Sequence, residues 1–370
     1  MKIVFFTDTY KPQVNGVVTS IEFFSEELKK MGHEIYIFCP KDKKMPKEGN
    51  VYTLRSFKFK SYPEYRIGVP SAKIMKIMKR INPDIVHIHG LASVGLAGLS
   101  AAKYMRIPII MTYHTHVIDY TQYLSKRKFF EKYNKKMIKR YIKWFFNKAD
   151  IVIAPSNPIR DILIDCGINK PVIILPTGIK IKNIEKMKKF RKPTILHVGR
   201  IVKEKGIDSI IKAFAEITKK IDARLIITSD GPYKKNLEKL IESKKLKNVE
   251  FTGYIRERKI IELYKKSHVF ACASKTETQG LVVLEAMAYG CPVVAANYLG
   301  FRDFIKNGEN GLLFDKEWEI PEKIIKIIKD KKLREKIIKN GYKTAQKYTI
   351  KKCAKRLENI YKSLVNKNEN

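Results

Sequence analysis

The strongest constraint on the fold of this chain is a regular alternation of short apolar runs with longer amphipathic segments. Apolar runs at 2–7, 33–39 and 108–112 have the length and composition of buried strands. Between the first two runs, apolar residues from Ile21 to Met31 recur with the spacing of one helix face. Strands that alternate with helices pair in parallel, so we predict an α/β chain with doubly wound parallel sheets.

The alternation starts again in the second half of the chain, whose 370 residues are enough for two medium domains with full cores. The segment 180–192 is charged and lacks a strong apolar period, so it is predicted to link the two domains. The predicted strands of the second half are 194–199, 224–228, 249–252, 269–273 and 292–296. We therefore expect two domains of the same architecture.

The second half contains a stretch, 277–286, that carries several ligand-binding features together. Gly280 stands where a predicted helix begins, and the free N–H groups of a first helical turn bind phosphate well. Glu277 and Glu285 flank that position, and two carboxylates beside an anion are costly unless they bind hydroxyls or a cation. The sugar and ribose hydroxyls of a nucleotide-sugar would satisfy them, whereas two solvated surface carboxylates are the alternative.

Other predicted strands of the second half also end in polar residues. Arg200 and Lys205 follow the first strand, and a guanidinium fork with an ammonium suits a diphosphate, whereas two surface cations in a basic protein are the alternative. Asp230 follows the next strand, and an ordinary turn without a ligand would also explain an aspartate at this position. After the third strand, the Tyr254 side chain or the Ile255 backbone is placed to contact a base.

In the first half, Gly16 lies at the first strand-to-helix turn, where open α/β sheets bind ligands. The GxGxxG pattern of a dinucleotide site is absent, but Gly16 would still let backbone approach a phosphate or a sugar. His114 and His116 follow the strand 108–112, where either one is a candidate ligand contact. A hydrogen-bonded structural histidine is the alternative, and it is our interpretation of the three histidines at other strand ends, which are His87, His89 and His197.

The charge balance restricts the partners of the chain. Lys and Arg number 75 against 37 Asp and Glu, a net charge of +38 that calls for nucleic acid, an anionic membrane or phosphorylated substrates. The 5 cysteines form no CxxC pair or Cys/His cluster, which predicts reduced thiols in the cytosol and no metal site. Neither a signal peptide nor a run long enough to span a bilayer is present, so membrane contact is expected to be peripheral.

The segment 125–148 is the most basic part of the first half, with aromatic residues interleaved among its cations. This composition is typical of an amphipathic helix on an anionic membrane, and the alternative is a solvated cationic face above an aromatic core face. The predicted membrane-binding residues are Lys126, Arg127, Lys128, Lys132, Lys135, Lys136, Lys139, Arg140, Lys143 and Trp144.

Three stretches of the sequence resemble the family 4 retaining glycosyltransferases, which have the GT-B fold, and the resemblance covers nearly the whole chain. They are 277–286 followed by Gly-Cys-Pro-Val-Val, the stretch 6–17, and 113–120 with its two histidines. The last two are most similar to the glycolipid branch that includes diacylglycerol glucosyltransferases and phosphatidylinositol mannosyltransferases.

The resemblance implies two Rossmann-like domains that face a cleft. Residues 1–180 would form the acceptor-side domain, 181–345 the nucleotide-sugar domain, and 346–370 a helix that packs back on the first domain.

The resemblance also implies roles for single residues. Carried over by position, Arg200 and Lys205 would hold the diphosphate, and the Gly280 and Leu281 backbone would bind the phosphate. Glu277 and His114 would contact the transferred sugar, and Glu285 would bind the ribose. Gly16 would lie near the phosphate or acceptor, and the donor site would be completed by Asp230, Tyr254 and Ile255. The catalytic group would be Glu277, His114, Arg200 and Lys205. Ser229 and Thr278-Gln279 depart from the family pattern, which leaves the donor sugar open.

The activity implied is a retaining, metal-independent transfer of a hexose, without a cofactor, from a nucleotide-sugar such as UDP-glucose to a diacylglycerol-type lipid. The enzyme would work as a peripheral protein on the cytoplasmic face of the cell membrane. Transfer to a cell-envelope polysaccharide or another soluble acceptor, with GDP-mannose as donor, is the alternative within the same class. A nucleic-acid-binding protein is the alternative from another class, and only the charge favours it.

Overall fold

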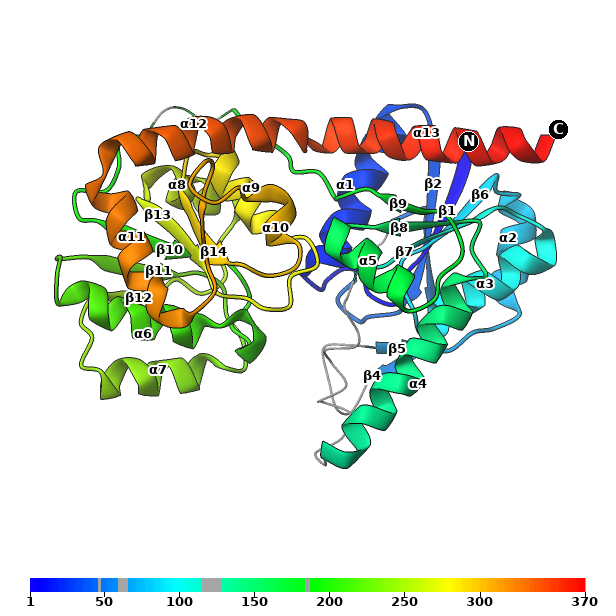
Figure 1. Cartoon of the computed structure of the whole chain (residues 1–370). Coiled ribbons are helices and arrows are strands. Elements are labelled where there is room, and N and C mark those ends of the chain that lie inside the picture. The colour runs from blue at the N-terminus through cyan, green and yellow to red at the C-terminus, as the bar shows by residue number, and fades with distance from the viewer. Residues whose placement is uncertain (46–47, 59–65, 115–127, 184, 186, 370) are drawn as a thin grey trace. The chain divides into compact units, whose positions relative to one another are not determined.

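The structure, a computed structural model, describes the chain except residues 46–47, 59–65, 115–127, 184, 186 and 370, and except the side chains of 128–133 and 367–369. The chain divides into two compact units (Figure 1). Unit 1 consists of Met1–Gly178 together with Ile350–Asn370, and unit 2 consists of Ile179–Thr349. The predicted α/β class with parallel sheets is confirmed in each unit.

The sheet of unit 1 has, within the described residues, seven parallel strands in the order β3-β2-β1-β6-β7-β8-β9. Their bounds are β1 Lys2–Phe6, β2 Glu34–Pro40, β3 Val51–Leu54, β6 Ile85–Ile88, β7 Ile109–Thr112, β8 Ile151–Ala154 and β9 Val172–Ile174. A short antiparallel hairpin, β4 Ser56–Lys58 with β5 Arg66–Gly68, stands apart from this sheet. The strand order reverses beside β1, and ligands bind at such a position in open α/β sheets.

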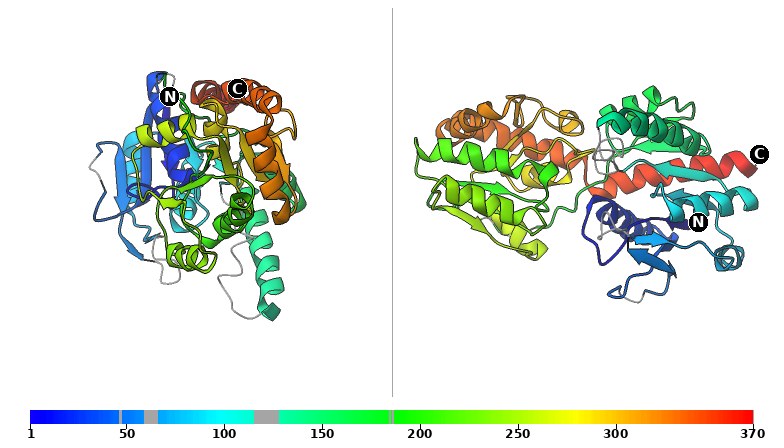
Figure 2. Two further views of the ribbon diagram at one scale, coloured as in Figure 1. Left: turned by 90° about the vertical axis from the view of Figure 1, so that its left-hand side faces the viewer. Right: turned by 90° about the horizontal axis from the view of Figure 1, so that it is seen from below.

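Helices cover both faces of this sheet (Figure 2). They are α1 Gly16–Lys30, α2 Lys73–Ile81, α3 Ser93–Met105, α4 Lys128–Phe146, α5 Asn157–Asp165 and α13 Ile350–Glu369. Alternate residues of β1 supply the two cores: Val4 and Phe6 pack in one cluster, and Ile3 and Phe5 in the other. The second cluster includes the apolar face of α13, so this helix completes the core of unit 1.

Unit 2 repeats the plan with six parallel strands, within its described residues, in the order β12-β11-β10-β13-β14-β15. The strands are β10 Thr194–His197, β11 Arg224–Ile227, β12 Val249–Phe251, β13 Val269–Cys272, β14 Val293–Ala296 and β15 Leu312–Phe314. The helical segments are η2 Lys203–Lys205, α6 Ile207–Thr218, α7 Lys234–Ser243, α8 Glu257–Lys266, α9 Leu281–Ala288, α10 Phe301–Phe304, η3 Glu317–Glu319, α11 Ile320–Lys329 and α12 Lys331–Lys347. The order reverses between β10 and β13, so the loops after these strands are expected to bind a ligand.

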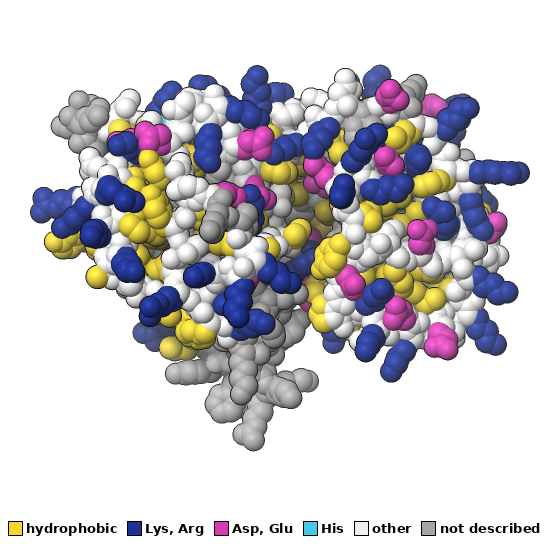
Figure 3. Space-filling view, turned by 180° about the vertical axis from the view of Figure 1, so that it is seen from behind, with side chains coloured by type: hydrophobic (Ala, Val, Ile, Leu, Met, Phe, Trp, Pro, Cys, Tyr) yellow, Lys and Arg dark blue, Asp and Glu magenta, His cyan; other side chains and the backbone are white. Residues whose placement is uncertain are grey.

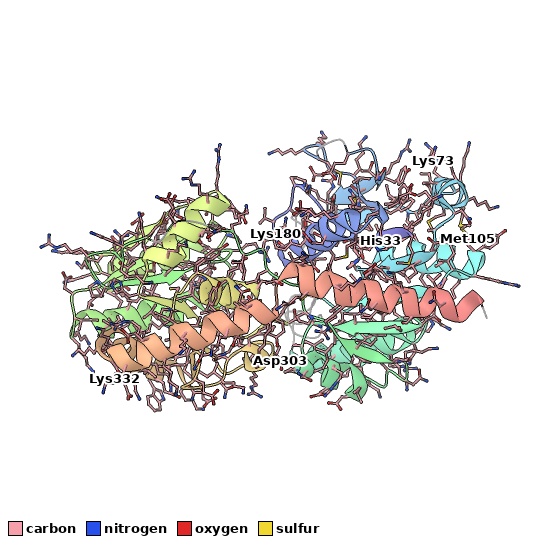
Figure 4. The ribbon with its side chains drawn as sticks, turned by 90° about the horizontal axis from the view of Figure 1, so that it is seen from above. His33, Lys73, Met105, Lys180, Asp303 and Lys332 are labelled. Atoms are coloured by element: carbon pink, nitrogen blue, oxygen red, sulfur yellow. The ribbon has the colours of Figure 1, made fainter. Side chains whose placement is uncertain are left out.

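The end of the chain forms three helices, α11, α12 and α13, and the last of these belongs to unit 1. Polar contacts fix α13 there. His33 lies beside it (Figure 4), with Nε2 3.3 Å from Glu358 Oε1, and His87 Nδ1 lies 2.6 Å from Tyr361 Oη. Helix α13 therefore belongs to the same compact unit as the first half of the chain.

The charged segment 180–192, predicted as a linker, packs on unit 2 through a few of its described residues. Ile181 and Phe190 contact one of its cores, and the Arg224 guanidinium stacks on Phe190 at 4.6 Å from the ring centroid. Lys189 Nζ donates a hydrogen bond to the Ser267 carbonyl at 2.6 Å. Scattered apolar residues among many lysines hid this packing from the sequence pattern.

Candidate functional site

The loops that follow β10, β11 and β12 are joined directly at the carboxyl edge of the unit 2 sheet. Ile201 N donates to Asp230 O at 3.0 Å, and Ser229 N donates to Gly253 O at 2.8 Å. Gly231 is required here, because a Cβ at this position would lie 2.2 Å from Ile201 O. The three predicted ligand-binding loops therefore form one continuous surface.

The fourth loop, after β13, joins this surface through an ion pair between Lys205 and Glu277. Their side chains are 21% and 19% exposed. Burial favours the neutral amine, but the adjacent Glu277 carboxylate outweighs it and raises the pKa of Lys205. The fold thus brings the predicted diphosphate cation and the predicted sugar carboxylate into contact across a separation of 72 residues.

Arg200 lies on the same edge and is half-buried. Its charge reaches Lys205, where it opposes the rise in the pKa of that amine. Two cations at one strand end, one of them partly neutralised by Glu277, leave a local excess of positive charge. Such a surface favours a phosphorylated ligand.

Gly280 occupies the N-cap position of α9, as the sequence predicted for a helix start. Its φ of 86° lies in the left-handed region, and a Cβ would come within 2.4 Å of Phe301 Cε1. Leu281 begins the first turn of α9, where backbone N–H groups generally lack intrahelical acceptors, although Val283 N donates to Gly280 O at 3.1 Å. Gly280 therefore shapes a site where an anion can contact the backbone, and Phe301 fills the space that a side chain at this position would need.

Glu285 projects from α9 and is half-buried. The Tyr264 hydroxyl lies 3.3 Å from Glu285 Oε2. Burial raises the pKa of Glu285 to about 7, and the hydrogen bond from Tyr264 opposes that rise. Among the described residues Glu285 forms no ion pair, so this carboxylate differs from Glu277 in having no cation beside it.

Three further predicted donor-site residues lie on the same edge. Tyr254 is 71% exposed at the end of β12, whereas Ile255 packs against the core beside α8. Asp230 Oδ1 accepts a hydrogen bond from Gly231 N at 2.7 Å, which is the local turn contact that the simpler interpretation expected. Of the three, Tyr254 presents the side chain most accessible to a ligand.

In unit 1, Gly16 is the first residue of α1, and the Asn15 side chain caps the helix by accepting from Val17 N and Val18 N. A Cβ on Gly16 would find no heavy atom of the described residues within 4 Å, and the φ of Gly16 is not positive. Neither packing nor backbone conformation therefore requires a glycine here. Close approach of a ligand remains a physical reason for it.

His114 follows β7, and its Nε2 lies 2.8 Å from His89 Nδ1. Burial lowers the pKa of His114 to about 4, so its ring is neutral at physiological pH. Beside this pair, His87 contacts the hydroxyls of Tyr361 and Thr112 at 2.6 and 2.7 Å. The structural interpretation of His87 is consistent with these contacts, whereas His89 is tied to a predicted site residue. His116 lies outside the described residues.

Helix α4 contains most of the predicted membrane-binding residues. Its apolar face is partly core, because Phe145 and Phe146 are buried, but Met137 and Trp144 remain 48% and 49% exposed. An open hollow beside α5 is lined by five of its cations, which are Lys135, Lys136, Lys139, Arg140 and Lys143. Lys126 and Arg127 lie outside the described residues, and Lys128 and Lys132 lie in the helix without described side chains. Figure 3 shows that Lys and Arg also predominate on other parts of the surface.

Two contacts at the site were missed by the sequence analysis. The Asp8 carboxylate accepts from Ala92 N and Val94 N at 2.7 and 2.9 Å, which caps α3 beside the first strand end. Tyr264 belongs to an ordinary amphipathic helix, and nothing in its own spacing marks it as the partner of Glu285. Asp8 could have been found from the sequence, because it is a polar residue in a loop that follows a strand.

Two searches of the described residues bear on metal and membrane binding. No group of three or more His, Cys, Asp or Glu side chains there is arranged to hold a metal ion. None of the helices found there combines the length and apolarity that a bilayer-spanning segment needs.

Comparison with known proteins gives consistent matches for both halves. The model described as Glycosyltransferase Family 4 matches residues 14–183, and the model described as Glycosyl transferases group 1 matches 180–344. The alpha-monoglucosyldiacylglycerol synthase of Acholeplasma laidlawii is 32% identical over 100% of this chain and 98% of its own length. The synthase of the same name from Streptococcus pneumoniae is 32% identical, covering 89% of this chain and 78% of its own.

Solved structures agree on the fold. The Anabaena protein HepE, crystallised with UDP, superposes with a TM-score of 0.76 at 20% identity, covering 98% of this chain and 100% of that one. The sucrose-phosphate synthase of Thermosynechococcus elongatus also gives a TM-score of 0.76 at 20% identity, with 98% of each chain covered. The GT-B fold predicted from the sequence is confirmed.

Proposed function

The chain belongs to the family 4 glycosyltransferases, and from that premise we propose that it moves a hexose from a nucleoside-diphosphate sugar to a membrane lipid. UDP-glucose is the proposed donor and a diacylglycerol-type lipid the proposed acceptor. The observation that carries the proposal is the contact of Lys205 with Glu277 at the carboxyl edge of unit 2, which joins a phosphate-binding cation to a carboxylate suited to sugar hydroxyls. The relatives named as glucolipid synthases support the lipid acceptor.

In the proposed reaction, the leaving nucleoside diphosphate gains negative charge as the glycosidic bond breaks. Arg200, Lys205 and the first turn of α9 supply positive charge and N–H donors on one edge of unit 2. Preorganised charge of this kind lowers a barrier without reorganisation during the reaction. Glu277 would bind the transferred sugar, and Glu285 would accept hydrogen bonds from the ribose.

We propose that the transfer needs no metal and retains the configuration of the anomeric carbon. The cations of unit 2 would provide the charge that a divalent ion supplies in other transferases. Activity in EDTA equal to that in magnesium or manganese is the expected result, and loss of activity that either ion restores would refute metal independence. Proton NMR of the product, compared with the donor, reports the anomeric configuration.

The proposed acceptor side is unit 1. The α4 cations would be drawn to anionic headgroups, each contributing about 1 kcal/mol near the surface. The exposed Met137 and Trp144 on the same helix would lie at the interface. We therefore propose that the enzyme works as a peripheral protein on the cytoplasmic face of the cell membrane.

The decisive experiment offers UDP-glucose, UDP-galactose, UDP-N-acetylglucosamine and GDP-mannose, each with diacylglycerol-containing vesicles or with soluble saccharides. Products are identified by mass spectrometry. A hexosyl diacylglycerol from UDP-glucose is the expected product. Transfer only to saccharides, or only from GDP-mannose, would replace the proposed acceptor or donor with that alternative.

Membrane binding is tested separately by cosedimentation with vesicles of varied anionic lipid content. The test variant replaces Lys135, Lys136, Lys139 and Arg140 with Ser, and a matched control replaces four exposed lysines of unit 2, Lys235, Lys239, Lys244 and Lys247, with Ser. The two variants change the net charge equally. Only the α4 variant should lose binding to anionic vesicles, and wild-type binding should weaken as salt rises. Equal loss in both variants would mean that general charge, rather than α4, binds the membrane.

A further inference from the structure

Glu285 is held by a tyrosine that no motif indicates. Tyr264 lies in α8, is fully buried, and packs between Phe270 and Tyr289 with ring centroids 5.7 and 6.3 Å away. Its ring is therefore fixed by the core of unit 2. The hydroxyl at the end of a fixed ring has a fixed position, so Tyr264 restrains the carboxylate that it contacts.

The Tyr264 hydroxyl lies between two acceptors. Its oxygen is 3.3 Å from Glu285 Oε2 and 3.3 Å from Val282 O. The hydroxyl has a single proton to donate. An ionised Glu285 is the stronger acceptor, because a hydrogen bond to a charged oxygen is about twice as strong as one between neutral groups. When Glu285 is protonated, the Val282 carbonyl competes for the same proton.

The surroundings of Glu285 leave its charge poorly compensated. The charged group that acts on it from α8 is Glu257, a like charge that is itself paired with Lys182 at 2.5 Å. The Tyr289 hydroxyl accepts from Lys182 N and donates to Lys180 O, so it is not hydrogen-bonded to Glu285, although the Glu285 charge also acts on it. The buried Cys291 and Cys272 thiols act on Tyr264 from β13 and the end of α9. On the α12 side, α9 is packed through Met287 against Gly341, which carries no charge.

Burial without a nearby cation explains why the pKa of Glu285 is raised to about 7. The protonated and ionised forms are thus close in free energy near neutral pH. A ligand whose hydroxyls donate to this carboxylate binds the ionised form, since a protonated carboxyl offers fewer acceptor sites. Such a ligand shifts the equilibrium toward the ionised form, and the released proton passes to solvent.

We propose that Tyr264 is a positioning residue of the nucleotide site, whose hydroxyl holds Glu285 in place to accept the ligand hydroxyls, and that binding of a nucleoside diphosphate expels a proton from Glu285. This inference rests on the proposed function, because it takes Glu285 as the ribose ligand. It adds a residue from α8 and a dependence of donor affinity on pH.

The direction of the pH effect follows from the raised pKa. Below about pH 7 the free site is mostly protonated, so the affinity for a nucleoside diphosphate falls by up to tenfold per pH unit. Above pH 8 the carboxyl is already ionised, and the affinity levels off. Removing the Tyr264 hydroxyl removes a hydrogen bond that favours the ionised form, so the midpoint should move to higher pH.

The test is isothermal titration of the full chain with UDP and with GDP from pH 6 to 9, in two buffers of different ionisation enthalpy. Wild type, Tyr264→Phe, Tyr289→Phe and Glu285→Gln are compared. Tyr289→Phe is the matched control, because it removes a hydroxyl of the same aromatic cluster that contacts Lys182 N instead of Glu285. Melting temperatures of all four proteins check that each is folded.

The expected wild-type result is release of about half a proton per nucleotide bound at pH 7, falling toward zero at pH 9. In Tyr264→Phe the midpoint should rise and proton release should persist at higher pH, while Tyr289→Phe should match wild type. Glu285→Gln should abolish the part of the release that comes from Glu285 and leave only protons lost by the terminal phosphate of the nucleotide, whose second pKa is about 6. An unchanged midpoint in a folded Tyr264→Phe would overturn this inference alone. Wild-type affinity in Glu285→Gln at pH 8.5 would instead overturn the assigned ribose contact, and no binding of either nucleotide would overturn the proposed function.

Discussion

The carboxyl edges of the two sheets present different chemistry on the same architecture. In unit 2 the edge carries Arg200 and the Lys205–Glu277 ion pair, so charge dominates. In unit 1 the corresponding edge carries histidines bonded to one another and to hydroxyls, and burial keeps the His114 ring neutral. The difference teaches that a parallel sheet fixes where a ligand lies, while the residues at the strand ends decide whether that ligand is an anion or a neutral hydroxyl compound.

The largest expected effect comes from the charged edge. If Glu277 binds the transferred sugar as proposed, replacing it with Gln should lower kcat by about 100- to 1000-fold with a smaller change in KM. Steady-state kinetics against Glu317→Gln, an exposed carboxylate of the same unit, provides the comparison. Wild-type turnover in both variants would show that Glu277 serves only as the ion-pair partner of Lys205.

The neutral edge should respond less strongly. His114→Asn should cost about tenfold in kcat/KM, which is the expected loss of one hydrogen bond to the proposed sugar. Because the pKa of His114 is lowered to about 4, its ring stays neutral until the pH falls that far, and its replacement should leave the pH profile above 6 unchanged. A profile that loses a step between pH 6 and 8 in this variant would show that the neutral edge carries charge after all.

A smaller effect, opposite in sign for stability and activity, is expected at Gly16. Alanine is the better helix residue by about 1 kcal/mol, and no heavy atom of the described residues lies within 4 Å of a Cβ at this position. Gly16→Ala should therefore leave the melting temperature unchanged or higher while raising KM roughly tenfold. Normal KM in a stabilised variant would mean that no ligand approaches this glycine.

The smallest effect concerns Glu358 of α13, whose charge is stabilised mainly by two lysines of the same helix. Glu358 is buried and accepts from Lys355 and Lys362 at 2.7 Å, and these bonds lower its pKa to about 2. The contribution to stability is present above the unfolded pKa near 4.5 and is lost as pH falls through 2. Glu358→Gln should cost about 1 kcal/mol in urea unfolding at pH 7, and less near pH 3. A constant difference at both pH values would point to packing rather than charge.

The sequence predicted the sheets and the order of strand ends well, because apolar periodicity and glycines determine both locally. It also placed Arg200, Lys205 and Glu277 on one edge, as the structure does. It could not identify pairs made by tertiary packing. His89 reaches His114 across 25 residues, and Tyr264 reaches Glu285 across 21, and each lies in an element whose own pattern looks structural.

The apolar pattern also could not distinguish buried from exposed aromatic residues within one helix. In α4, Phe145 and Phe146 fill the core of unit 1, whereas Trp144 beside them stays exposed. A list of interleaved aromatics cannot separate these roles, because the register of the helix against its sheet decides which residues turn inward. The short strands β3 and β15 were also missed, although β12, which is no longer than β15, was predicted.

Unit 1 is discontinuous in sequence, since α13 follows all of unit 2. During translation, the sheet of unit 1 emerges first but lacks the helix that covers Ile3, Phe5 and Ile37 until unit 2 has been made. Domains generally fold as they leave the ribosome, and α1 belongs to the same core, so the nascent chain exposes only the part of this core that α13 covers while Ile179–Thr349 is made. All residues of unit 2 are therefore synthesised before the second core of unit 1 can be completed.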